Sequence, residues 1–97
     1  MTQKLAPIHP GEILKEEFLD PLGLSIRAFA KSIRVPPNRV SRLVAGQSRV
    51  TADTALRLAK ALDTSPELWM TLQSRYALQC AEDAGVVPDD IASVVAA

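Results

Sequence analysis

The sequence predicts an all-α fold of five helices, followed by a C-terminal extension with or without a short sixth helix. Apolar residues recur at helical spacing, and no stretch alternates with a period of two over more than a few residues. Prolines and capping residues separate the helical stretches. The 97 residues are 47% apolar but include only one Trp, one Tyr and two Phe, so Leu, Ile, Val and Ala must fill a single core.

The first helix is expected to begin near Pro10, because proline fits the first helical turn. His9 precedes it, and a capping or packing role explains this histidine better than catalysis does. Pro21 and Gly23 are expected to end the helix. The side chains predicted to face the core are Ile13, Leu14 and Phe18.

Two short helices joined by a tight turn are predicted over residues 25–46. Ser25 is a suitable N-cap, and the first of the two helices is expected to stop near Arg34. Residues before a proline avoid the helical conformation, so the chain must turn before Pro37, which can open the second helix. Gly46 ends it. The inward positions are Ile26, Phe29, Ala30 and Ile33, then Val40, Leu43 and Val44.

This helix pair has the spacing of a helix-turn-helix, whose second helix enters the major groove of DNA. Small Ala30 lies where the helices must approach closely, and Val40 and Leu43 face inward. The outward face of the second helix carries polar and basic side chains. Arginine can bond guanine and asparagine can bond adenine, each in a bidentate way. These outward residues are Asn38, Arg39, Ser41 and Arg42.

The zero net charge hides a segregation along the chain. Residues 1–20 carry −2, residues 21–52 carry +6 and residues 53–97 carry −4. The middle segment, here called the basic window, holds six cations and no acid. A solvated surface can have this composition, but the basic window covers the helix-turn-helix, which favours a surface that faces phosphates.

The last two helices follow strong start signals. Thr51 is expected to cap the fourth, in which Asp53 and Arg57 lie one turn apart and can pair. Ser65 begins the fifth, which is expected to reach Asp83. Apolar side chains cover several of its sides, as in a deep core or a subunit interface. We expect residues 1–84 to form a helix-turn-helix DNA-binding and dimerisation domain, and residues 85–97 to form a tail in which Pro88 could start a last helix.

The residues offer little that could serve as a catalytic site, and we expect the protein not to be an enzyme. The sequence contains no glycine-rich phosphate loop, and no metal or other cofactor is expected. Cys80 is the one cysteine and lies among apolar neighbours, so a buried, inert thiol is expected. No apolar run has the length of a membrane span, and residues 1–9 do not resemble a signal peptide, so a cytoplasmic location is expected.

Three stretches together resemble the HigA-type antitoxins of the Xre/Cro, lambda-repressor-like helix-turn-helix family. They are IHPGEILKEEFLDPLGLS, AFAKSIRVPPNRVSRLVAGQSRVTADTALRLAKAL and TSPELWMTLQSRYAL. The resemblance implies a homodimer formed through the C-terminal helices, repression of its own operon at an inverted-repeat operator, and neutralisation of a HigB-type toxin that cleaves mRNA. By position, it implies DNA contacts from Arg27, Pro37, Asn38, Arg39, Ser41, Arg42, Gln47, Ser48 and Arg49, and a core or dimer role for Trp69, Leu72 and Tyr76.

Two positions depart from that family pattern. Ile26 stands where a polar residue is common, and Arg34 stands where the turn usually has glycine. Two other functions stay open. One is a stand-alone Xre-type transcriptional regulator without a toxin. The other is a protein-binding module that has lost DNA binding, which the basic window disfavours.

Overall fold

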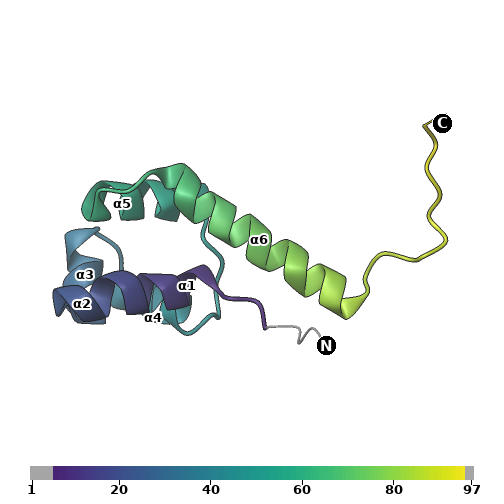
Figure 1. Ribbon diagram of the computed structural model, residues 1–97. Helices are drawn as coiled ribbons and strands as arrows, with labels where there is room; N and C mark the ends of the chain where they lie inside the picture. The colour runs from purple at the N-terminus through teal and green to yellow at the C-terminus, as the bar shows by residue number, and fades with distance from the viewer. Residues whose placement is uncertain (1–5, 96–97) are drawn as a thin grey trace.

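All regular secondary structure in the described part of the chain is helical (Figure 1). The computed structural model describes residues 6–95. The first three helical segments follow one another without a break, and together they form one helix, here called the N-terminal rod. With the rod counted as one helix, the described residues contain the five predicted helices. The segments are α1 (Pro10–Ile13), η1 (Leu14–Leu19, π-helical), α2 (Asp20–Leu22), α3 (Ile26–Ser32), α4 (Pro37–Val44), α5 (Ala52–Leu62) and α6 (Pro66–Ala84).

The N-terminal rod begins as predicted but continues through Pro21. His9 caps it, because its Nδ1 accepts a hydrogen bond of 2.9 Å from the amide two residues further on. The prediction that Pro21 ends the helix is wrong. In η1 the N–H of Asp20 donates to the carbonyl of Lys15, five residues back, and Pro21 then lies in the first turn of α2, where a missing N–H is tolerated. Gly23, left-handed at φ 66°, ends the rod.

Helices α3 and α4 form the predicted helix-turn-helix. The Ser25 hydroxyl accepts a hydrogen bond of 3.1 Å from the N–H of Ala28, and Pro37 occupies the first turn of α4. Ile26 is half-buried and packs against the core. The predicted inward faces are confirmed, since the buried side chains are Phe29, Ala30, Ile33, Val40 and Leu43.

Arg34 lies in the turn between α3 and α4 with a left-handed backbone, at φ 59°. This conformation costs an L-residue about 1–2 kcal/mol, and the greater unfolded-state entropy of glycine offsets about 0.5–1 kcal/mol of that. We therefore expect Arg34→Gly to raise the free energy of unfolding by about 0.5–1 kcal/mol in urea denaturation. A loss of stability would show that Arg34 makes compensating contacts that outweigh the strain.

Helices α5 and α6 complete the fold. Thr51 and Ser65 cap them as predicted, each side-chain oxygen accepting a hydrogen bond from the amide three residues on. Helix α6 begins beside α5 and runs past the other helices, so that its C-terminal half projects from the bundle (Figure 1). The core is mostly aliphatic, as expected, with Leu14, Leu19, Phe29, Ala30, Ile33, Val35, Val40, Leu43, Val50, Ala55, Leu58 and Trp69.

The chain after Gly85 forms no helix in the described residues, so the optional sixth helix is absent from 86–95 (Figure 1). The apolar side chains that were expected to build it, Ile91, Val94 and Val95, are all exposed. A short helix without tertiary packing is marginal in water, which accounts for its absence.

Candidate DNA interface

Helix α4 has a polar outward face because its apolar side chains are fixed in the core. Val40 and Leu43 are 2% and 3% exposed. Asn38 and Arg42 lie one turn apart on the opposite side of the helix and are exposed. Ser41 is half-buried, and its hydroxyl donates a hydrogen bond of 3.2 Å to the carbonyl of Asn38. The helix therefore presents an amide and a guanidinium, the groups suited to adenine and guanine, on a face whose direction the buried side chains fix.

The other predicted DNA contacts lie on segments next to α4. Arg27 is exposed in the first turn of α3, which packs on α4, and Pro37 is exposed where α4 begins. The loop that follows α4 carries exposed Gln47 and Arg49 and half-buried Ser48. The predicted DNA contacts, which span residues 27–49 of the sequence, therefore lie on α4 or on the segments next to it.

A residue that the sequence did not reveal, Gln73 of α6, holds that loop in place. Its Oε1 accepts a hydrogen bond of 2.7 Å from the backbone N–H of Val50, and both residues are buried. A buried amide without a partner costs about 1–3 kcal/mol, so this bond fixes the end of the loop. The only signal in the sequence was a polar residue, Gln73, within an apolar helical pattern. Its partner, Val50, lies 23 positions away, so the pattern does not identify the contact.

Arg39 is positioned differently from Asn38 and Arg42. Its Nη1 donates a hydrogen bond of 2.8 Å to Oδ2 of Asp53 in the first turn of α5. Asp53 also accepts from Nε of Arg57 at 3.1 Å, which confirms the predicted pair one turn apart. Hydrogen bonds from Arg57 and then Arg39 lower the pKa of the Asp53 carboxyl, so it is ionised at neutral pH. We call these three residues the Asp53 network.

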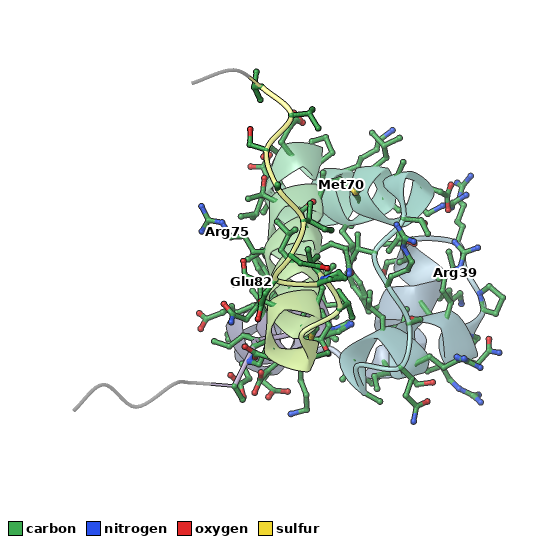
Figure 2. All side chains as sticks on the ribbon, turned by 90° about the vertical axis from the view of Figure 1, so that its right-hand side faces the viewer. Arg39, Met70, Arg75 and Glu82 are labelled. Carbon is green, nitrogen blue, oxygen red and sulfur yellow. The ribbon has the colours of Figure 1, made fainter. Side chains whose placement is uncertain are left out.

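The three predicted core or dimer residues of α6 differ in burial. Trp69 is fully buried, with its ring 5.6 Å from that of Phe18, and it belongs to the core. Leu72 and Tyr76 are half-buried, and the Tyr76 ring meets the ring of His9 edge-on at 4.8 Å. The exposed side of α6 lies away from α4, since Figure 2 shows Arg75 and Arg39 at opposite edges of the molecule.

Reactive groups are few in the described residues. Cys80 is half-buried, so the expectation of a buried thiol is wrong, because it lies on the projecting half of α6 (Figure 1). A hydrogen bond with Cys80 raises the pKa of the Tyr76 phenol above its usual value. Within residues 6–95, no three His, Cys, Asp or Glu side chains cluster as metal ligands would. None of the described helices combines the length and apolarity needed to cross a membrane.

Comparison with known proteins finds antitoxins and transcriptional regulators that are similar to this chain. A solved structure of Pseudomonas aeruginosa antitoxin HigA with the higBA promoter is 40% identical, with a TM-score of 0.86 and coverage of 92% of this chain and 99% of that one. Antitoxin HigA-1 of Vibrio cholerae is 43% identical over 70 residues, 72% of this chain and 66% of the relative.

An uncharacterized HTH-type transcriptional regulator of Haemophilus influenzae is 47% identical over 78 residues, which is 80% of this chain and 71% of the relative. The family model described as helix-turn-helix matches residues 14–69, from the N-terminal rod to the start of α6. That match includes the whole of α3, the turn and α4. The chain therefore belongs to the Xre-type helix-turn-helix family, and its relatives include HigA antitoxins.

Proposed function

We propose that this HigA-like helix-turn-helix protein is the antitoxin of a type II toxin-antitoxin system. In this proposal it binds the operator of its own operon, represses transcription and neutralises a HigB-type toxin that cleaves mRNA. The proposed activity is binding without catalysis, and we expect it in the cytoplasm, where both partners occur. The similarity to an antitoxin HigA structure that contains the higBA promoter supports this.

The observation that carries the DNA-binding proposal is the outward face of α4. Asn38 and Arg42 are exposed there, while buried Val40 and Leu43 fix the rotation of the helix. The face lies within the basic window, in which every charged residue is a cation that can attract phosphates. A gel-shift titration with DNA from upstream of the gene tests it. A specific shift is expected, and equal affinity for unrelated DNA would contradict operator binding.

We propose that the protein acts as a homodimer through the outer side of α6. Leu68 and Leu78 are 40% and 64% exposed on that side, and such apolar residues are expected to be covered in an assembly. Two recognition helices about 34 Å apart would then meet successive major grooves of an inverted repeat. Light scattering is expected to give a dimer at micromolar concentration, and a monomer both free and on DNA would contradict this.

Operator binding is expected to weaken steeply with salt, because cations of the basic window displace counterions from phosphates. For about six phosphate contacts per dimer, affinity should fall about 10³-fold between roughly 50 and 200 mM salt. Fluorescence anisotropy at several salt concentrations measures the slope. An affinity that hardly changes with salt would mean that the basic window does not face phosphates.

The second candidate function is a transcriptional regulator without a toxin partner. The 47% identity with an uncharacterized HTH-type transcriptional regulator of Haemophilus influenzae supports this candidate. Co-expression with the neighbouring reading frame separates the two functions. Co-purification of a small basic protein, with relief of its growth inhibition, is expected for an antitoxin. DNA binding without any such partner would support the regulator.

A further inference from the structure

The Asp53 network joins three helices at the edge of the predicted DNA-binding surface. Arg57 donates a hydrogen bond of 2.8 Å from Nη1 to the carbonyl of Ile33, at the end of α3. Its Nε holds Asp53 in the first turn of α5, and Asp53 in turn holds Arg39 of α4. The Arg39 guanidinium is thus tied, through two other side chains, to the backbone of the helix-turn-helix.

Anchoring leaves most of the Arg39 guanidinium available. Among the described residues, its only hydrogen bond is the one from Nη1 to Asp53, and the side chain is 46% exposed. A guanidinium has five N–H donors, so four remain to bind DNA. A long, flexible side chain loses rotamer freedom on binding, and a partner within the protein removes part of that loss beforehand.

Asp53 is also the first acid after the basic window. Its carboxylate is 55% exposed and lies 2.8 Å from Arg39, so it is close to any phosphate that Arg39 reaches. Non-specific binding rests on phosphate attraction alone, and one fixed negative charge opposes it at every register on DNA. Specific binding adds contacts to bases, and an arginine that is already held in one orientation makes these contacts more strongly.

We propose that Asp53 is a specificity-determining residue, which orients Arg39 for the operator and repels phosphates of unrelated DNA. This inference rests on the proposed operator binding. It assigns to an acid outside the recognition helix a part in choosing the DNA sequence. It also predicts that neutralising Asp53 moves operator and non-specific affinities in opposite directions.

The test compares Asp53→Asn with wild type on an operator duplex and on a random duplex at one low salt concentration. Operator affinity should fall about three- to tenfold, because the Asn amide carries no charge and has one acceptor oxygen where the carboxylate has two, so it holds Arg39 less firmly. Random-duplex affinity should rise about two- to fivefold, because a negative charge is removed. Arg39→Lys keeps the charge but not the forked geometry, so it should weaken only operator binding. The double variant should lose no more operator affinity than Arg39→Lys alone.

Asp20→Asn is the matched control. Asp20 is exposed and paired with Lys15 at 2.9 Å, so this change removes the same charge and one ion pair outside the basic window. An equal shift in specificity from Asp20→Asn would overturn the proposal, because general charge would then explain the effect. Equal changes on both duplexes in Asp53→Asn, or additive operator losses in the double variant, would also overturn it.

The wild-type measurement keeps this inference separate from the function on which it rests. If wild type does not prefer the operator, the proposed function fails, and the role of Asp53 fails with it. If wild type prefers the operator and Asp53→Asn keeps the full preference, only the role of Asp53 is wrong. Thermal unfolding of each variant confirms that the comparison is made between folded proteins.

Discussion

Trp69→Ala is expected to leave the protein largely unfolded at 37 °C. The indole is fully buried, contacts the ring of Phe18 and donates a hydrogen bond of 2.8 Å from Nε1 to Oγ1 of Thr64. Truncating a buried aromatic side chain to alanine costs about 3–5 kcal/mol, which is close to the whole stability of a small domain. Urea denaturation followed by circular dichroism measures the loss.

Leu56→Ala is the control for this change, since Leu56 lies on α5 and is 60% exposed. Removing an exposed side chain should change stability by no more than about 0.5 kcal/mol. If Trp69→Ala unfolds at nearly the same urea concentration as Leu56→Ala, Trp69 does not hold α6 against the rest of the fold.

Gly11→Ala is expected to force the N-terminal rod away from α4. A Cβ at Gly11 would lie 1.7 Å from the carbonyl oxygen of Leu43 and 3.0 Å from Cα of Val44. Both atoms belong to backbone, so no side-chain rotation relieves the overlap. Alanine is otherwise the better helix former by about 1 kcal/mol, so a loss of stability must come from this contact. We expect the free energy of unfolding to fall by about 3 kcal/mol or more.

Gly23→Ala is the matched control for Gly11→Ala. A Cβ at Gly23 meets no atom within 4 Å, but its φ of 66° is left-handed. Its expected net cost is therefore about 0.5–1 kcal/mol, which is the backbone strain of about 1–2 kcal/mol less the entropy that alanine saves in the unfolded chain. Chemical denaturation of both variants gives the comparison. If Gly11→Ala is as stable as wild type, the close packing of the rod on α4 is wrong.

The helices could be predicted from sequence where a signal acts over a few residues. Ser25, Thr51 and Ser65 cap helices because each side chain reaches an amide three residues on. The pair of Asp53 and Arg57 likewise follows from helical spacing alone. Local patterns of this kind determine the five helices and their inward faces.

Other features depend on groups that only the folded chain brings together. Arg39 and Asp53 are 14 residues apart, and no spacing rule relates the first turn of one helix to the first turn of the next. The helix continues through Pro21 because η1 shifts its hydrogen bonds, which the proline itself does not signal. Cys80 is partly exposed because α6 projects beyond the bundle (Figure 1).

In the proposed function α4 reads the DNA sequence while the following loop contacts phosphates, and one comparison of two variants tests these roles most directly. Operator and random-duplex affinities are measured for Arg42→Ala and Arg49→Ala at one salt concentration. Both side chains are exposed, so both variants should fold.

Arg42→Ala should cost about 1–3 kcal/mol per half-site on the operator and less on random DNA. Arg49→Ala should weaken both by similar factors, because phosphate contacts position the protein without specifying sequence. Equal losses on both duplexes for Arg42→Ala, with an operator-only loss for Arg49→Ala, would contradict these roles.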